Sequence, residues 1–190
     1  MRLFAAVLPP EEAVRELGAA VDGLHRLPGA DDLRWTGRPG WHFTLAFYGE
    51  VEEELTGPLA DRLSRAARRT PPVPLVLRGG GHFGGRALWA GVSGDVTTLR
   101  LLADRAEAAA RRAGVPMGEH RRYRPHLTVA RSRQAADFAP YVTALDDFAG
   151  RPWTAAELCL VRSNLPRSGV PGEQPRYETV ARWALAGAGG

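Results

Sequence analysis

The sequence predicts a mixed fold of helices and strands that contains the same supersecondary unit twice. The pattern histidine, apolar residue, threonine, apolar residue occurs at residues 42–45 and again at 126–129. Each copy starts a short apolar stretch, and a helical pattern and two further strand-like stretches follow it. Two copies of one unit imply a pseudo-two-fold axis, which would bring the two H-x-T strands face to face in a central cleft.

The chain begins with elements that precede the first copy. Residues 2–8 form a short apolar strand, and the two prolines after it suit the first turn of a helix with Glu11 and Glu12 near its positive end. Residues 24–40 are rich in Gly, Pro and Asp, which predicts a loop around a short strand near 33–35.

The first H-x-T strand is predicted at residues 42–48. Strict alternation along a strand places side chains on opposite faces in turn. One face therefore carries His42, Thr44, Ala46 and Tyr48, and the other carries Phe43, Leu45 and Phe47.

The rest of the first unit and the helix after it follow from periodicity and turn residues. A helical stripe of apolar residues runs through 53–69, with acidic residues early and arginines late. Residues 75–78 and 87–92 predict a hairpin whose long tip is the Gly-rich stretch 79–85. An amphipathic helix at 95–113 completes this part of the chain.

The second unit repeats this order. After the strand at 125–131 we expect a helical segment at 134–148 and strands at 157–163 and 177–185, joined by a polar loop. With 190 residues and 44% hydrophobic content, the chain is expected to form a single domain over residues 1–190.

Composition excludes several functional classes. All 25 basic residues are arginine, so a lysyl-nucleotide adduct, a Schiff base and a P-loop lysine are impossible. The net charge of +4 favours anionic partners. Clustered Cys/His ligands and an HExxH motif are absent from the sequence, and we predict no metal and no cofactor. The single cysteine, Cys159, is predicted to be a small core residue.

Bulk features also predict the setting of the protein. The apolar run at the start is far shorter than the roughly 20 residues of a membrane span, and it lacks the features of a signal peptide. A lone cysteine suits a reducing compartment, so we expect a cytoplasmic protein with no membrane partner. The helical patterns contain no coiled-coil seam, which makes a monomer the default expectation.

Two of the five histidines stand out as candidates for catalysis. His42 and His126 each begin an H-x-T pair, which puts an imidazole and a hydroxyl on one strand face about 6 to 7 Å apart. A single pair would be explained by β propensity, but core packing gives no reason to repeat an ionisable group at matching positions. His25, His82 and His120 lie in loop stretches and are interpreted as structural or surface residues.

Two facing imidazoles and two threonines suit the cleavage of a phosphodiester. In-line displacement needs a base on the attacking side and an acid on the leaving side, and hydroxyls can hold the non-bridging oxygens. Histidine serves either role near neutral pH.

With these motifs the chain resembles the two-histidine phosphoesterases, and among them the bacterial and archaeal RNA 2′,3′-cyclic phosphodiesterases, once called 2′-5′ RNA ligases. The resemblance rests on RLFAAVLPP, HFTLAFYGE, RYRPHLTVAR and the final YETVARWAL, and so covers nearly the whole chain. It implies a bilobal α+β fold in which each lobe is an antiparallel sheet with helices outside, and the cleft lies between the lobes.

The resemblance also implies roles for individual residues. His42 would be the acid that protonates the departing O3′ and leaves a 2′-phosphate, and His126 the base that activates water, although near symmetry permits the reverse. Thr44 and Thr128 would donate to the non-bridging oxygens, and Arg131 would stabilise the growing charge. Phe47 would pack on the terminal base, but strict alternation puts it opposite His42. Arg124 is either an RNA contact or part of a solvated basic loop.

Related activities stay open at this stage. The same residues would serve reversible 2′-5′ joining of RNA, opening of ADP-ribose 1″,2″-cyclic phosphate, or cleavage of 2′-5′ oligoadenylate. A non-enzymatic alternative is an RNA-binding module that uses its basic loops and aromatic residues. The expected partner in the preferred interpretation is an RNA end that carries a 2′,3′-cyclic phosphate.

Overall fold

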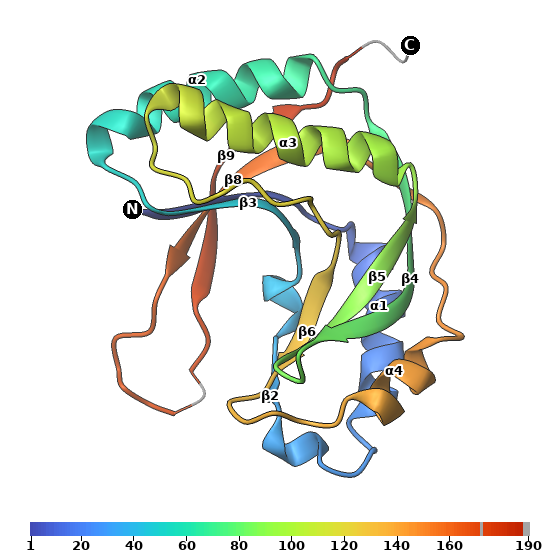
Figure 1. Cartoon of the computed structure of the whole chain (residues 1–190). Helices are drawn as coiled ribbons and strands as arrows, with labels where there is room; N and C mark the ends of the chain where they lie inside the picture. Colours follow the sequence, from blue (N-terminus) through green and yellow to red (C-terminus); the bar gives the residue numbers. More distant parts are fainter. Residues whose placement is uncertain (172, 188–190) are drawn as a thin grey trace.

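The computed structural model describes residues 1–171 and 173–187, which form two antiparallel sheets with helices on their outer faces (Figure 1). The helices are α1 (Glu11–Leu24), α2 (Glu53–Arg68), α3 (Val96–Ala113) and α4 (Ala139–Leu145), with short 3-10 turns at Ala30–Asp32 and Arg38–Gly40. The strands are β1 (Arg2–Val7), β2 (Arg34–Trp35), β3 (Phe43–Glu50), β4 (Val73–Phe83), β5 (Ala87–Gly94), β6 (Leu127–Arg131), β7 (Trp153–Ala155), β8 (Glu157–Asn164) and β9 (Arg176–Ala184).

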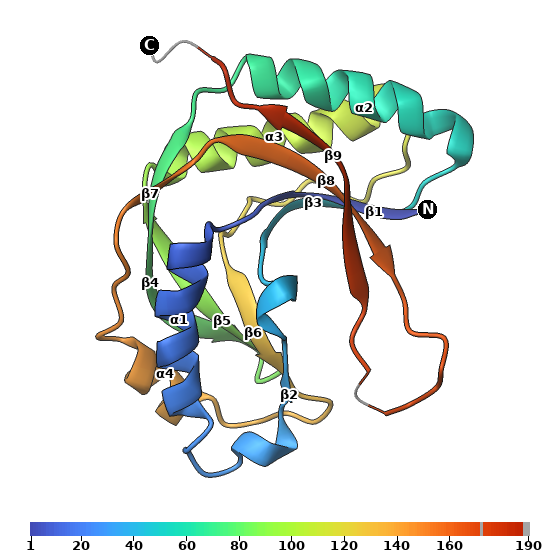
Figure 2. The ribbon, with the colours of Figure 1, turned by 180° about the vertical axis from the view of Figure 1, so that it is seen from behind.

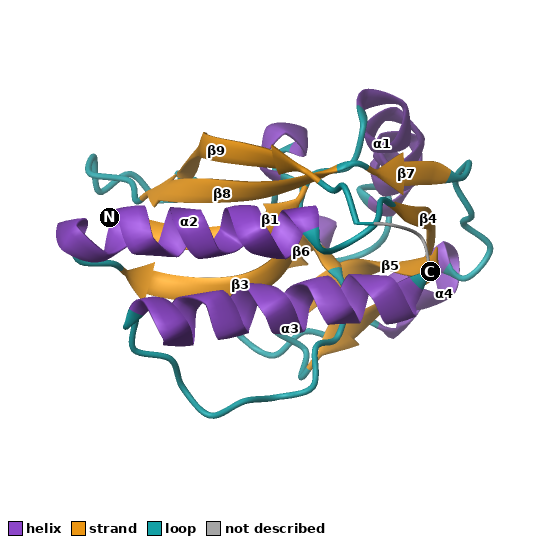
Figure 3. Ribbon diagram, turned by 90° about the horizontal axis from the view of Figure 1, so that it is seen from above, coloured by secondary structure: helices purple, strands orange, loops and turns teal. Residues whose placement is uncertain are grey.

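Each sheet has its own pair of covering helices. The first sheet has the order β3-β1-β8-β9, and α2 and α3 lie side by side across its outer face (Figure 3). The second sheet has the order β2-β6-β5-β4-β7, and α1 lies in front of it in the view of Figure 2, with α4 beside α1. The predicted bilobal α+β architecture with outer helices is therefore confirmed.

The two units exchange their hairpins. The hairpin β4–β5 follows the first H-x-T strand in sequence, yet β5 pairs with β6, the second H-x-T strand. The hairpin β8–β9 follows the second H-x-T strand, yet it joins β1 and β3 in the first sheet. Each sheet is thus completed by a hairpin from the other half of the sequence.

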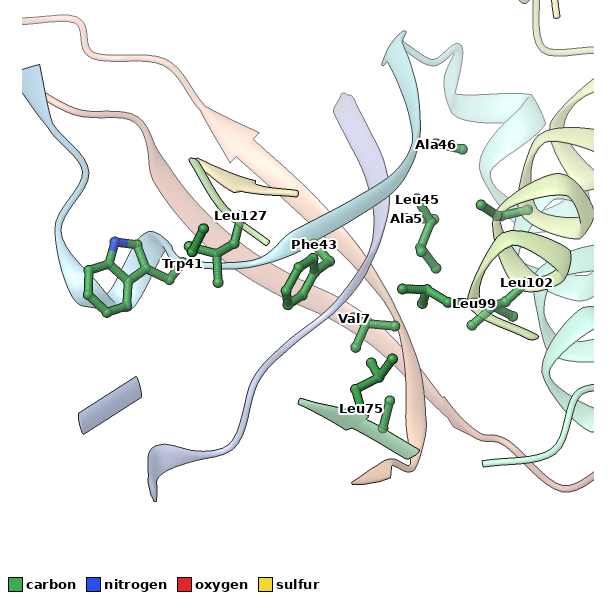
Figure 4. Close-up of a cluster of buried hydrophobic side chains, with 14 of the residues drawn as sticks. Ala5, Val7, Trp41, Phe43, Leu45, Ala46, Leu75, Leu99, Leu102 and Leu127 are labelled. Carbon is green, nitrogen blue, oxygen red and sulfur yellow. The ribbon is translucent and has the colours of Figure 1, made fainter. Parts of the chain in front are cut away.

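One hydrophobic core runs from the helices α2 and α3 into the second sheet. Leu45 and Ala46 of β3 face Leu99 and Leu102 of α3, and the same cluster continues to Leu127 of β6 (Figure 4). At the helix side of this core, the Tyr48 hydroxyl donates to the carbonyl oxygen of Ala106 over 2.9 Å. None of the helices in the described residues is both long and apolar enough to cross a membrane.

Three sequence predictions need correction. The Gly-rich stretch 79–85 is mostly strand and not a hairpin tip, because residues 80–83 pair with β5 and only residues 84–86 turn. The predicted helix at 134–148 shrinks to α4, which starts at Ala139 next to a proline. The short strand β7 was not predicted, and it pairs with β4 as the edge strand of the second sheet.

Candidate active site

Both H-x-T strands carry a β-bulge at the residue after the threonine. In the pairing of β3 with β1, Thr44 lies opposite Ala6 and Ala46 opposite Ala5, which leaves Leu45 as the extra residue. In the pairing of β6 with β5, Thr128 lies opposite Trp89 and Ala130 opposite Leu88, which leaves Val129 as the extra residue. The pattern of buried and exposed residues is the same in the two strands from the residue after each histidine onward.

The bulges decide which side chains share a face with the histidines. A bulge places two consecutive side chains on one side of the strand and so shifts the alternation by one residue. Phe47 accordingly lies opposite Phe4, whose ring contacts His42 with centroids 4.7 Å apart. Strict alternation, which put Phe47 on the far face and Tyr48 on the near one, was therefore wrong beyond Thr44.

The two H-x-T strands meet at a small cavity between the sheets, with a volume of about 70 Å³. That volume exceeds the roughly 10–15 Å³ that one water needs, so the cavity has room for a group larger than one water. The residues around the cavity are Thr36, Gly40, His42, Thr44, His126, Thr128, Arg131 and Tyr177. Five of the seven residues predicted as catalytic or substrate-binding thus lie together.

Hydrogen bonds to the backbone fix the tautomer of both imidazoles. Nδ1 of His42 lies 2.7 Å from the carbonyl oxygen of Gly40, and Nδ1 of His126 lies 2.6 Å from that of Arg124. A carbonyl oxygen only accepts, so Nδ1 carries the proton in each neutral ring. Nε2 is then the nitrogen that can accept or release a proton in each ring.

The two threonines differ in their hydrogen bonding to the neighbouring histidines. Nε2 of His42 lies 2.8 Å from Oγ1 of Thr44, so the neutral imidazole accepts a hydrogen bond from that hydroxyl. Among the described residues, Nε2 of His126 has no such partner, and Thr128 borders the cavity without a bond to it. The site is therefore nearly symmetric in residue types but asymmetric in hydrogen bonding.

Burial and nearby positive charge favour the neutral form of both histidines. Burial is the main cause that lowers the pKa of His42, and the positive charges of Arg131 and His126 lower it further, while the Gly40 carbonyl opposes them. Burial also lowers the pKa of His126, helped by Arg131 and Arg124 and opposed by the Arg124 carbonyl. An anion bound between them would favour the protonated form of either ring.

Aromatic rings hold His42 in place. The ring of Phe4 packs beneath His42, and the edge of Tyr177 meets His42 with centroids 5.3 Å apart. The packing around position 40 is tight, because a Cβ there would lie 3.2 Å from the Tyr177 ring and 3.3 Å from Thr36, and these neighbours would have to move by a few tenths of an ångström. The imidazole is thus confined by packing as well as by its hydrogen bonds.

Phe47 and Arg124 lie outside the cavity. Phe47 is 49% exposed, and the guanidinium of Arg2 stacks over its ring at 4.8 Å. The guanidinium of Arg124 stacks over Phe83 at the same distance, and the rings of Phe83 and His126 form a T-shaped pair with centroids 4.8 Å apart. Both predicted residues therefore stand at the rim of the site, Phe47 on β3 and Arg124 in the loop before β6.

Sequence reasoning missed four residues around the histidines: Phe4, Thr36, Phe83 and Tyr177. Tyr177 lies in the final strand motif and Phe83 in the Gly-rich stretch, but neither carries a local signal that connects it with a catalytic histidine 40 or more residues away. Only the pairing of Tyr177 with Ser163 on β8 and the hairpin exchange bring these rings to the site.

The remaining reactive groups lie elsewhere. The ring of His25 packs on Trp35, and His120 pairs with Glu107. Among the described residues one group could hold a metal ion, formed by Asp104, Glu107 and His120, and none of these borders the cavity. Cys159 is buried, and burial raises the pKa of its thiol, which is unfavourable for a nucleophile.

Comparison with known proteins agrees with this architecture. The model of the 2′-5′ RNA ligase superfamily matches residues 9–167. An RNA 2′,3′-cyclic phosphodiesterase of Geobacillus stearothermophilus is 31% identical over 81% of this chain, which spans only about half (48%) of that relative's length. A protein of the same name from Aeropyrum pernix is 29% identical over 84% of this chain and 94% of its own.

Solved structures show the same fold over almost the full length. The protein TT0787 of Thermus thermophilus has a TM-score of 0.76 at 28% identity and covers 98% of this chain and 99% of its own. Apo LigT of E. coli has a TM-score of 0.75 at 26% identity, with 97% and 96% covered. The fold and the paired H-x-T strands define a two-histidine phosphoesterase architecture. The chain belongs to the 2′-5′ RNA ligase superfamily.

Proposed function

We propose that this protein is an enzyme that hydrolyses the 2′,3′-cyclic phosphate at an RNA end to a 2′-phosphate. The observation that carries the proposal is the pair of imidazoles on one small cavity, each with Nδ1 bound to a carbonyl and Nε2 left for proton transfer. Two threonine hydroxyls and Arg131 border the same cavity and can hold a phosphoryl group.

The proposed reaction uses one imidazole in each protonation state. Neutral His126 takes a proton from water through Nε2 while the water oxygen attacks phosphorus. The bond from phosphorus to O3′ breaks, and protonated His42 gives its Nε2 proton to O3′. The products are a 2′-phosphate and a 3′-hydroxyl, with His126 left protonated and His42 neutral, and exchange with solvent restores the starting state.

Substrate binding prepares this state. Both pKa values are lowered in the free protein, partly by the charge of Arg131. The negative phosphate counters that charge and favours protonation of one ring. The hydroxyl of Thr44 then turns from Nε2 of His42 toward a non-bridging oxygen, while Thr128 reaches the other.

The relatives support RNA ends as the substrate class. Two matching proteins, from Aeropyrum pernix and Thermotoga maritima, carry the name RNA 2′,3′-cyclic phosphodiesterase, and this chain covers 94% and 84% of their lengths. LigT of E. coli has been crystallised with 3′-AMP, a nucleotide with phosphate at the ribose 3′ position. Phe47 and Arg124 at the rim are proposed to contact the terminal nucleotide, Phe47 through its exposed ring.

The test is hydrolysis of a short RNA with a 2′,3′-cyclic phosphate end in the presence of EDTA, with 2′- and 3′-phosphate products separated. We expect 2′-phosphate only, and a loss of roughly 10²- to 10⁴-fold in kcat for both His42→Ala and His126→Ala. His120→Ala is the matched control, because this histidine pairs with Glu107 away from the cavity. Binding of RNA without turnover would reject the enzyme and favour an RNA-binding module.

Three further proposals concern the whole protein. Residues 1–190 are proposed to act as one bilobal unit, supported by the hairpin exchange that ties both sequence halves into both sheets. The predictions of a monomer and of a cytoplasmic location rest on the sequence alone. Size-exclusion chromatography with light scattering and cell fractionation would test them.

A further inference from the structure

A second, larger hollow adjoins the active site on the second sheet. Its volume is about 600 Å³, and it is bordered by Phe83 and Trp89 together with Arg78, Arg100 and Arg124. Phe83 connects the two sites, because its ring forms a T-shaped contact with His126 and the guanidinium of Arg124 stacks over its face. A ligand that extends from the cavity past His126 therefore enters this hollow.

Glycines keep the floor of the hollow free of side chains. Gly80 and Gly91 both border the hollow. A Cβ at Gly80 would lie 2.6 Å from the Leu145 side chain, and a Cβ at Gly91 would lie 2.6 Å from the carbonyl oxygen of Arg78. Trp89 lies against this floor, with its ring centroid 5.3 Å from that of Phe83. The Gly-rich stretch does not border the catalytic cavity, and its glycines instead form part of the floor of this aromatic hollow.

The hollow has unmet hydrogen-bonding capacity. Within residues 1–171 and 173–187, none of the three arginines forms an ion pair, and Asp146 is the single acidic residue at the border. Nε of Arg100 and Nε1 of Trp89 are buried donors without an acceptor in the same residues. The three arginines make this surface positively charged, which favours a ligand with anionic acceptor groups.

We propose that this hollow binds the nucleotide that precedes the cyclic-phosphate end of the RNA. Aromatic rings stack on any base, and arginine forks bind phosphate oxygens, so the two kinds of side chain match the two parts of a nucleotide. The proposal rests on the proposed function, because it assigns the direction in which the RNA leaves the cavity. It predicts that the enzyme prefers an oligonucleotide to a single cyclic nucleotide.

The test compares 2′,3′-cyclic AMP with di- and trinucleotides that end in a 2′,3′-cyclic phosphate. Arg78→Ala and Arg100→Ala remove charges that lie outside the catalytic cavity. Each should raise KM for the oligonucleotides about tenfold, the loss expected for one charge-assisted hydrogen bond, and leave kcat unchanged. Turnover of 2′,3′-cyclic AMP should stay within about twofold of the wild type, which also shows that the variants fold.

The matched control is Arg62→Ala combined with Arg112→Ala. Both arginines border a different hollow, between α2 and α3 on the outer face. Loss of charge in general would weaken oligonucleotide binding equally in the control and in the double variant Arg78→Ala/Arg100→Ala. If the hollow is a local subsite, only the double variant Arg78→Ala/Arg100→Ala should bind the oligonucleotide more weakly.

The possible outcomes separate the two proposals. An equal effect on mononucleotide and oligonucleotide, or no effect on either, overturns the subsite while the hydrolase stands. If the wild type hydrolyses no substrate, the proposed function fails, and the subsite is then judged by binding alone. For that purpose we would measure fluorescence anisotropy of a 5′-labelled trinucleotide with a 2′-phosphate end, and equal affinities of wild type and double variant would reject the subsite.

Discussion

Gly81→Ala tests the link between the Gly-rich strand and the active site. A Cβ at position 81 would lie 2.4 and 2.5 Å from two atoms of the Trp89 ring, so the ring must retreat by about 1 Å to reach ordinary contact at 3.4 Å. Gly to Ala in a strand otherwise stabilises by roughly 0.5–1 kcal/mol, whereas overpacking costs about 1–3 kcal/mol. We expect the clash to dominate and to lower the free energy of unfolding by about 1–2 kcal/mol.

The same change should impair catalysis. Trp89 pairs across the ladder with Thr128, and its ring centroid lies 6.2 Å from that of His126. Displacement of reacting groups by about 1 Å can cost up to 10²-fold. We therefore expect kcat/KM for 2′,3′-cyclic AMP to fall between about 10- and 100-fold.

Urea denaturation and steady-state kinetics measure both effects. Gly57→Ala in α2 is the control, because a Cβ there meets no atom within 4 Å, and it should stabilise the protein. A second check is Gly81→Ala in a Trp89→Leu background, where the clash disappears and the substitution should no longer destabilise. Unchanged stability and activity of the single variant would refute the steric argument.

Three further predictions concern acid–base chemistry, base stacking and the core. Burial and Arg131 lower the pKa of both His42 and His126. In the proposed mechanism the reactive free enzyme has one protonated and one neutral ring, so kcat/KM should peak below the ordinary histidine pKa of about 6.5. Arg131→Gln removes a repelling charge and should move the peak to higher pH; a peak above neutrality in the wild type would contradict this reasoning. If Phe47 stacks on the terminal base, Phe47→Ala should raise KM for 2′,3′-cyclic AMP by about 5- to 100-fold, because one stacked base contributes roughly 1–3 kcal/mol. An unchanged KM would show that Phe47 does not contact the substrate. Tyr48→Phe loses the buried hydrogen bond to Ala106, so the free energy of unfolding should fall by about 0.5–1.5 kcal/mol in thermal or urea denaturation. A loss of activity in this variant would show that Tyr48 also acts on the site.

Local patterns in the sequence were sufficient for the elements and for the pair of histidines. The helices α2 and α3 follow from apolar periodicity, and their predicted bounds differ from the structure by one residue. The repeated H-x-T pattern identified His42 and His126, and five of the seven predicted site residues border one cavity. Apolar periodicity and a repeated motif can both be read directly from the order of residues, without knowledge of the tertiary structure.

The structure alone decided which side chains reach the site. Strict alternation put Phe47 on the face opposite His42, and a β-bulge at Leu45 reverses this, as a bulge at Val129 does for Arg131. A bulge depends on the register with a partner strand, and β1 and β5 lie about 40 residues away from β3 and β6 in sequence. Local residue patterns therefore do not predict that register.

Long-range pairing also decided what surrounds each histidine. Tyr177 reaches His42 because β8 and β9 join the first sheet, and Phe83 reaches His126 because β4 and β5 join the second. The sequence by itself identified the two candidate histidines and their threonines, and it excluded lysine chemistry. The tertiary structure determined the tautomers, the lowered pKa values and the aromatic walls, because these arise from contacts between segments that are distant in the chain.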